Sequence, residues 1–287
     1  MARVVMVHGI GQQHKGEHTL LTTWHPALLD GLTRTQIGPA LAREDVAMGF
    51  YGDLFRPPGQ RLAVGDPPYT HQDVTAGLET DLLMAWWNAT AQIDDRVVPP
   101  TATTLARSPH SAQKALLALY GSAFFSRIGM RALIFDLKQV SLYLSVPDLR
   151  HAARKRVLER ITPRTQVVVA HSLGSVVAYE ALCSMPDHPI RSLVTLGSPL
   201  GMRLIFDRLD PTPAPTGAWP SGTHPAMVWT NVTDPGDPVS AVHDLTPRFG
   251  PRVCAAQVHN GPHAHDATSY LTDEVTGTAI AEGLAHG

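Results

Sequence analysis

One segment constrains the fold of this chain more than any other: residues 167–179, which read Val-Val-Val-Ala-His-Ser-Leu-Gly-Ser-Val-Val-Ala-Tyr. β-favouring residues run into a polar corner that contains a glycine, and an apolar segment of helical character follows at once. This order predicts a buried strand, a sharp turn at Ser172 and a helix. The backbone doubles back closely at such a turn, which requires small residues on both sides of the serine. Ala170 and Gly174 meet that requirement.

The corner matches the pattern G-x-S-x-G with alanine in place of the first glycine. In that arrangement the serine Oγ is pushed out of the sheet, where a substrate and a base can reach it. Ser172 is therefore predicted to be the nucleophile of a hydrolase or acyl-transfer enzyme. The alternative is that Ser172 caps an ordinary helix, because serine is a favoured N-cap residue.

The rest of the chain predicts an α/β fold. Short apolar runs alternate with segments of helical periodicity, so we expect a mostly parallel sheet within a single domain that spans 1–287. We expect strands at 3–7, 46–50, 167–169, 190–197, 226–232 and 252–258, helices at 20–41, 74–93, 111–144, 149–161 and 275–284, and loops at 57–68 and 210–221.

Residues 69–144 differ in character from the rest of the chain. They contain two segments of helical pattern, with Trp86-Trp87 and Phe124-Phe125 adding large apolar surface, and no clear strand. Helices inserted between the strands of an α/β sheet are often active-site lids. We therefore expect a helical cap over the active site, the alternative being that these helices simply pack on the sheet.

A serine nucleophile needs a base, usually histidine, and an acid that orients the base. In a parallel sheet these groups meet at the carboxyl ends of the strands. Asp234 and Asp237 follow the strand expected at 226–232, in one turn-forming loop. We expect Asp237, in the sequence Asp-Pro-Val, to be the orienting acid, with Asp234 as the alternative.

Three histidines follow the last expected strand: His259, His263 and His265. His265 directly precedes the segment that leads to the final helix, so we expect it to be the base, with His263 second and His259 third. The cluster His-x-His-Asp would also suit a metal ion. Because a serine corner offers the histidine another use, we expect no metal at this position.

The negative charge that develops on the substrate carbonyl oxygen needs backbone N–H donors, which together form an oxyanion hole. One donor is expected to be Leu173, the residue after the nucleophile. The other is expected to be Ile10, in the glycine-containing loop 8–11 after the first strand. This loop lacks the lysine of a phosphate-binding P-loop and the third glycine of a dinucleotide-binding motif, so we expect no cofactor. His8 is expected to be a structural hydrogen-bonding residue.

The chain order Ser172, Asp237, His265 resembles that of the α/β-hydrolase superfamily. The sequences Val-His-Gly-Ile-Gly and Ala-His-Ser-Leu-Gly-Ser resemble bacterial serine hydrolases of this superfamily, including lipase, esterase and intracellular phospholipase branches. The resemblance covers 1–55 and 145–287 and implies a reduced sheet that starts at the oxyanion-loop strand. It also implies cleavage of a carboxylic ester or thioester through an acyl-enzyme. Alternatives are a peptidase or amidase, an acyltransferase such as a cyclase, or a non-catalytic binding protein on the same fold.

Charge and hydropathy limit the kinds of partner and the location that we expect for this chain. The formal net charge is −2, without the basic excess of a nucleic-acid-binding surface, so we expect a small-molecule acyl substrate. The N-terminus lacks the pattern of a signal peptide, and the uncharged stretches 82–93 and 115–126 are too short to span a bilayer. We therefore expect a cytoplasmic protein without membrane insertion. Cys183 and Cys254 are expected to be buried free thiols.

Overall fold

The computed structural model describes residues 1–35, 37–38, 40–56, 69–101, 109–223 and 227–285. The loop expected at 57–68 lies outside the described residues. The chain folds as an α/β protein around a six-stranded sheet with the order β2-β1-β3-β4-β5-β6. Each pairing between these strands is parallel, which confirms the expected class of sheet.

The strands lie where the apolar runs predicted them, with small differences at their ends. They are β1 (Val4–Val7), β2 (Val46–Met48), β3 (Val167–His171), β4 (Ser192–Leu196), β5 (Val228–Thr233) and β6 (Val253–Gln257). The central strands β1, β3 and β4 are buried along their whole length. Strands that are covered on both faces need apolar side chains at successive positions, which is why these segments read as continuous apolar runs.

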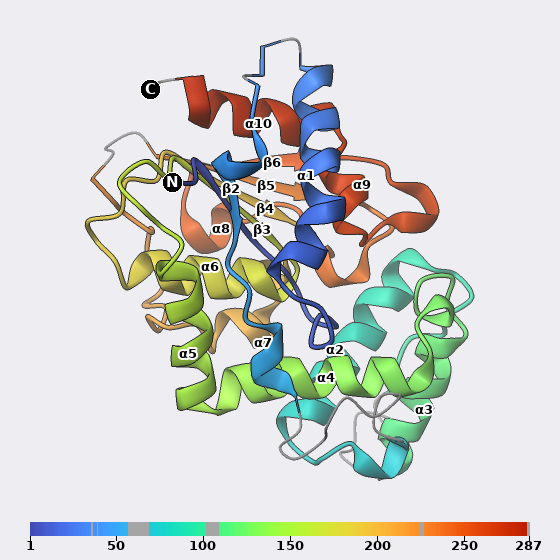
Figure 1. The fold of residues 1–287 in the computed structure, drawn as a ribbon. Coiled ribbons are helices and arrows are strands. Elements are labelled where there is room, and N and C mark those ends of the chain that lie inside the picture. Colours follow the sequence, from blue (N-terminus) through green and yellow to red (C-terminus); the bar gives the residue numbers. More distant parts are fainter. Residues whose placement is uncertain (36, 39, 57–68, 102–108, 224–226, 286–287) are drawn as a thin grey trace.

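Helices cover both faces of the sheet, so the molecule has three layers (Figure 1). They are α1 (Glu17–Arg34), α2 (Leu78–Ile93), α3 (Pro109–Tyr120), α4 (Met130–Ser145), α5 (Pro147–Leu158), α6 (Leu173–Cys183), α7 (Arg203–Phe206), α8 (Thr246–Phe249), α9 (Ala267–Leu271) and α10 (Glu274–Ala285). The side chains of β1 alternate between the layers: Val4 and Met6 pack with α1, α9 and α10, whereas Val5 and Val7 pack with α5, α6 and the inserted helices.

Two helix predictions were wrong in their extent. The first helix ends at Arg34 rather than at position 41, because the chain folds back over its end: a Cβ on Gly38 would lie 2.7 Å from the Leu32 carbonyl oxygen. Leu41 is buried as expected, but it lies in the connection between α1 and β2 and not in a helix. The segment predicted as one helix over 111–144 is divided into α3 and α4, with Gly121 and Gly129 in the break. Glycine is a poor helix former, and two of them favour the interruption.

The inserted helices share a core with the sheet. Side chains of α2 and α4 belong to the same buried apolar cluster as those of α6. A buried ion pair strengthens this connection, because the α6 carboxylate of Glu180 accepts hydrogen bonds from the Tyr143 hydroxyl (2.7 Å) and the Arg150 Nε (2.8 Å). The helices α4 and α5 are thereby fixed to the helix that follows Ser172.

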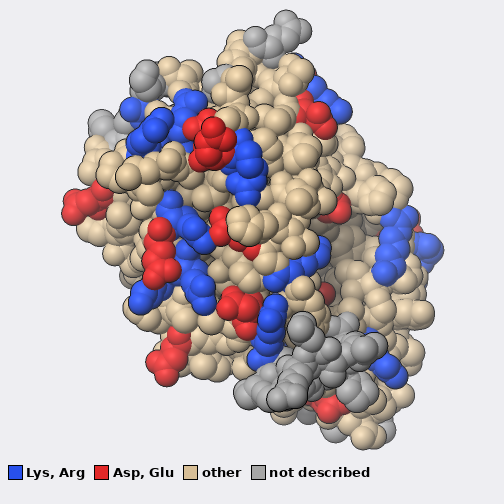
Figure 2. Space-filling view, in the orientation of Figure 1, with Lys and Arg blue, Asp and Glu red and all other residues tan. Residues whose placement is uncertain are grey.

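The surface carries charges of both signs. Figure 2 shows basic and acidic side chains mixed over the face that includes α5, whose arginines pair with acidic residues of neighbouring segments, as in Arg154–Asp210 and Arg156–Asp53. Among the described helices, none combines the length and the apolar character that a membrane span requires. Cys183 is half-buried, but Cys254 is exposed because β6 is an edge strand, so the prediction of two buried thiols was wrong for Cys254.

Candidate active site

Ser172 occupies the corner between β3 and α6 in a strained backbone conformation. Its φ is 54° and its ψ −130°, and it is the one non-glycine residue of the described chain with a positive φ. Such a conformation costs roughly 1–3 kcal/mol and occurs mainly at functional sites. The Ser172 side chain makes no capping hydrogen bond to α6, so the alternative of an ordinary helix cap does not describe this corner.

The corner is tight because the start of α6 lies directly on the end of β1. A Cβ built on Gly174 would lie 2.3 Å from the His8 carbonyl oxygen and 2.6 Å from that of Val7. No side chain fits in this space. Gly174 therefore has the role that the sequence pattern predicted for the position two residues after Ser172. Ala170, two residues before Ser172, is fully buried in β3.

The structure brings Ser172, His265 and Asp237 into one chain of hydrogen bonds. His265 Nε2 lies 3.0 Å from Ser172 Oγ, and His265 Nδ1 lies 2.7 Å from Asp237 Oδ2. Because Asp237 is buried as a hydrogen-bond acceptor, Nδ1–H is assigned as the donor to it, and Nε2 then accepts from the serine hydroxyl. Ser172 is almost fully buried, whereas the His265 side chain is 20% exposed and remains within reach of a ligand.

Asp237 is held by a network that the sequence did not reveal. Its Oδ1 accepts from the Val239 N–H (2.9 Å), and its Oδ2 accepts from the hydroxyls of Ser240 (3.0 Å) and Tyr270 (3.1 Å). Burial, and then the charge of Asp237, raises the pKa of Tyr270 far above its ordinary value, so the phenol stays a donor. Tyr270 lies on α9, and no local pattern links it to the loop after β5.

The alternative residues lie elsewhere. Asp234 accepts from the N–H groups of Gly236 (2.7 Å) and Asn260, so it stabilises the loop and does not bind His265. His259 and His263 are exposed. Within the residues that the structure describes, no group of histidine, cysteine or acidic side chains has the arrangement of a metal site.

The sequence also provided no specific indication of a glycine that lies directly against the His265–Asp237 pair. Gly197, directly after β4, has a φ of +55°, and a Cβ there would lie 2.9 Å from Asp237 Oδ2 and 3.0 Å from His265 Nδ1. A larger residue would displace the hydrogen-bonded pair. The only sequence signal was the Gly-Ser-Pro that ends the strand, which is typical of many turns.

The loop after β1 passes directly against Ser172. A Cβ built on Gly9 would lie 2.7 Å from the Ser172 Cβ. The neighbouring Ile10 lines one crevice together with Ser172 and Leu173. The structure therefore places both residues that were expected to supply oxyanion N–H groups beside the serine.

His8 and α4 brace this loop. His8 Nδ1–H donates to the Gly9 carbonyl (2.6 Å), and Tyr51 donates its backbone N–H to His8 Nε2 (3.1 Å) and its hydroxyl to the His8 carbonyl (2.7 Å). Burial lowers the pKa of His8 to about 4, so its ring is neutral. From α4, Gln139 accepts the Gly11 N–H at 3.3 Å. His8 thus has the structural role that the sequence suggested.

His171 supports His265 from below. Its Nε2–H donates to the His265 carbonyl (2.9 Å), and the two rings lie 4.6 Å apart. Burial, and then the proximity of His265, lowers the pKa of His171 well below its ordinary value. A neutral His171 places no second positive charge beside His265 when that ring takes up a proton.

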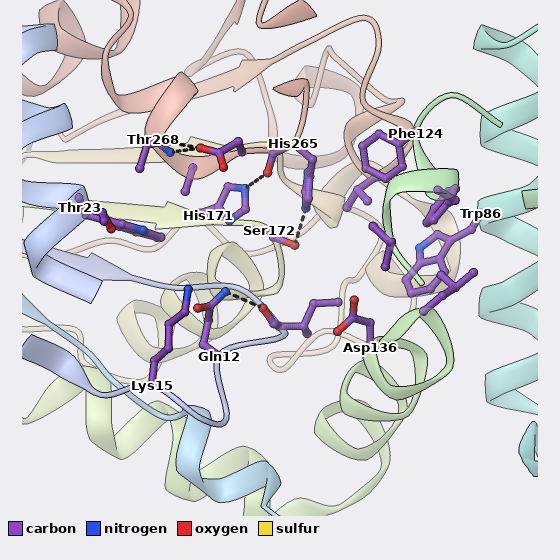
Figure 3. A pocket seen from close by; sticks show the side chains of 18 residues that line it. Gln12, Lys15, Thr23, Trp86, Phe124, Asp136, His171, Ser172, His265 and Thr268 are labelled. Carbon is purple, nitrogen blue, oxygen red and sulfur yellow. Dashed lines mark hydrogen bonds between the residues drawn. The ribbon is translucent and has the colours of Figure 1, made fainter. Parts of the chain in front are cut away.

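A cavity of about 430 Å³ opens onto Ser172 and His265. Figure 3 shows Trp86 and Phe124 on one side of Ser172 and Gln12, Lys15 and Thr23 on the other. The Phe124 ring lies edge-on to His265 with a centroid distance of 6.0 Å. Described residues of the inserted segment 69–144 therefore both pack in the core and line the cavity.

No protein-family model, curated protein or solved structure matches this chain. The function of the site is therefore argued from its geometry and from the chemistry of its residues.

Proposed function

We propose that this protein is a serine hydrolase of the α/β-hydrolase superfamily that cleaves a carboxylic ester or thioester through an acyl-enzyme. The observation that carries the proposal is the hydrogen-bonded chain Ser172–His265–Asp237, with the serine at a strained strand-to-helix corner. The three residues follow β3, β6 and β5, so they meet at the carboxyl edge of the sheet, where ligands bind in open α/β folds.

The sheet supports the superfamily assignment. The sequence resemblance implies a reduced sheet that starts at the oxyanion-loop strand, with the nucleophile after a central strand. In the observed order, β1 lies between β2 and β3, which places the loop with Ile10 next to the corner with Ser172. The elements that the proposed chemistry needs are thus neighbours in the sheet.

The reaction proceeds by two acyl transfers. The Ser172 Oγ attacks the substrate carbonyl carbon while its proton passes to His265 Nε2, and Asp237 stabilises the resulting imidazolium. The bond from the carbonyl carbon to the leaving oxygen or sulfur then breaks, and His265 gives its proton to the leaving group. Water then attacks the acyl carbon while His265 Nε2 takes its proton. The bond from the acyl carbon to Ser172 Oγ breaks, His265 returns the proton to Oγ, and the carboxylic acid is released.

The N–H groups of Ile10 and Leu173 stabilise the negative charge on the carbonyl oxygen in both steps. Removal of one such donor typically costs 10²–10³-fold in rate, on the order of 3–4 kcal/mol. The bracing of the loop by Tyr51 and Gln139 keeps the Ile10 donor in place without reorganisation during the reaction. The proposed reaction draws on no metal and no cofactor.

Labelling with a fluorophosphonate tests the nucleophile. The wild-type protein is expected to gain one phosphonyl group on Ser172, located by peptide mass spectrometry, and Ser172→Ala is expected to gain none. Ser175→Ala is the matched control, because Ser175 lies three residues further on but is buried and donates to the Ala170 carbonyl. Labelling of Ser172→Ala, or an unlabelled wild type, would contradict the proposal.

The type of acyl bond is tested with one ester, one thioester and one peptide anilide that share an acyl group. Hydrolysis of the ester or thioester is the expected result, whereas cleavage of the anilide alone would identify a peptidase or amidase. Activity that disappears in EDTA would contradict a mechanism that uses only Ser172, His265 and Asp237.

A further inference from the structure

Two cavities of very different size meet at Ser172. The larger, of about 430 Å³, is lined by His265, whereas the smaller, of about 20 Å³, is lined by Leu173; Ile10 and Ser172 line both. His265 borders the larger one but not the smaller one. The two spaces therefore differ both in volume and in their position relative to the proposed acid–base group.

The mechanism assigns a part of the substrate to each cavity. When Ser172 Oγ bonds to the carbonyl carbon, this carbon becomes tetrahedral. Its other three substituents are the oxyanion, the leaving group and the acyl chain. The leaving group must lie within reach of the proton on His265 Nε2, so it belongs in the larger cavity. The oxyanion faces the N–H groups of Ile10 and Leu173, and the acyl chain then extends away from His265, into the smaller crevice.

The smaller crevice has room for very little. Its volume of about 20 Å³ is less than a twentieth of that of the larger cavity, so it accepts only a small group unless its walls move. Its walls are buried side chains of α2, α4 and α7 and of the residue before α7, namely Leu82, Trp86, Val140, Met202 and Ile205. Protein cores are close-packed, so a longer acyl chain has to displace these side chains.

The larger cavity suits a bigger and amphipathic group. Trp86, Phe124 and Ile128 give it an apolar side (Figure 3). Its polar lining contains Gln12 together with basic and acidic side chains, namely Lys15, Asp136 and Asp266. An alcohol with an apolar body and a polar end would contact both kinds of lining at once.

We propose that this protein removes short acyl groups, acetyl above all, from esters of larger amphipathic alcohols. The acyl group occupies the crevice beside Leu173, and the alcohol occupies the cavity beside Phe124 and Lys15. The assignment rests on the proposed serine hydrolase function and adds to it the class of substrate and the residues that determine specificity.

Acyl length is tested with p-nitrophenyl acetate, butyrate, hexanoate and octanoate, which share one leaving group. Since each added methylene has to be accommodated by displaced core side chains, kcat/KM is expected to fall about tenfold or more from acetate to hexanoate. A wild-type optimum at hexanoate or octanoate overturns the proposal.

Met202 is the side chain whose truncation should change this preference. It lines the crevice on one side and an open surface groove of about 590 Å³ on the other, so Met202→Ala joins the two spaces. The ratio of hexanoate to acetate kcat/KM is expected to rise about tenfold. Leu204→Ala is the matched control, because Leu204 lines only the groove and should leave the ratio unchanged.

Val140→Ala provides a second enlargement of the crevice from α4, in case Met202→Ala does not fold. Phe124→Ala enlarges the alcohol side instead. It should leave the acyl ratio unchanged while lowering kcat/KM for 2-naphthyl acetate more than for phenyl acetate. An unchanged acyl ratio in folded Met202→Ala and Val140→Ala contradicts the crevice assignment.

Fluorophosphonate labelling distinguishes failure of the proposed short-acyl preference from failure of the proposed serine hydrolase function. A protein that labels at Ser172 but prefers long acyl chains is a serine hydrolase to which the crevice assignment does not apply. A protein that neither labels nor hydrolyses any of these esters contradicts the proposed function, and the short-acyl inference is overturned with it.

Discussion

Asp234 and Asp237 are three residues apart in one loop and have opposite surroundings. Asp237 accepts from His265, Ser240 and Tyr270, whereas Asp234 accepts backbone N–H groups of its own loop and of Asn260. The first set of contacts holds a carboxylate oxygen against the His265 ring. The second closes a turn.

Substitution by asparagine separates these roles. Asp237→Asn removes the charge that stabilises the imidazolium and permits the wrong His265 tautomer, so kcat is expected to fall on the order of 10⁴-fold. Asp234→Asn keeps an amide oxygen for the turn and should change kcat only a few-fold. Steady-state kinetics with one p-nitrophenyl ester, with circular dichroism as the check on folding, gives the comparison. Equal losses in the two variants would argue against the assigned acid.

Sequence reasoning reached Ser172 because the corner is a local pattern, in which strand, small residues and helix follow one another directly. The choice of Asp237 over Asp234 had weaker support, since both stand in a turn-forming Asp-Pro-rich loop. What distinguishes them are contacts with Tyr270 and His265, which are distant in sequence. The roles of His171 and Gly197 were not predicted either, because a buried histidine and a glycine after a strand have many structural uses and their contacts here are with residues distant in sequence.

At the scale of elements, the site depends on how closely α6 approaches β1. The helix begins against the carbonyl groups of Val7 and His8 at the end of the strand, and Leu173 and Ser172 line the same crevice. The sequence predicted both elements, but not the separation between them.

Gly174→Ala tests this contact. Its Cβ would lie 2.3 Å from a backbone oxygen that cannot rotate away, so helix and strand have to separate. The free energy of unfolding is expected to fall by roughly 1–3 kcal/mol, with a larger relative loss of activity. Gly129→Ala is the control, because a Cβ there has no heavy atom within 4 Å. Urea unfolding measures both variants, and the same stability in the two would show that the approach is looser than described.

The break between α3 and α4 shows where element prediction failed and why it matters. Apolar spacing ran without interruption through 111–144, whereas the structure turns between Gly121 and Gly129. The turn carries Phe124 into the cavity next to His265, a position that a continuous helix would not provide. Periodicity reports burial, and the large apolar residues of this turn, Phe124, Phe125 and Ile128, are also buried or half-buried, so the pattern could not separate helix from turn.

At the scale of the whole molecule, the fold encloses neutral histidines in its centre. His8, directly after β1, and His171, at the end of β3, are fully or almost fully buried, and burial is the main cause that lowers the pKa of each. Both rings make hydrogen bonds that fix the loops around Ser172. The carboxyl edge of the sheet around Ser172 is thus held together by histidines that cannot accept a proton without loss of stability.

Stability is therefore expected to decline in mild acid. Between about pH 6.5 and about pH 4 the unfolded chain binds a proton at position 8 that the native protein excludes, so the free energy of unfolding falls as the pH is lowered through this range. A difference of about 2.5 pKa units corresponds to roughly 3 kcal/mol for His8. His171 acts in the same direction.

His8→Gln isolates this contribution. The variant loses hydrogen bonds and should be less stable than the wild type near neutral pH, but its stability should decline less between about pH 6.5 and about pH 4 because position 8 no longer titrates. His263→Gln, which removes an exposed histidine, is the control and should keep the wild-type slope. Urea unfolding at several pH values measures the slopes. If His8→Gln declines as steeply as the wild type, buried His8 is not a source of the acid sensitivity.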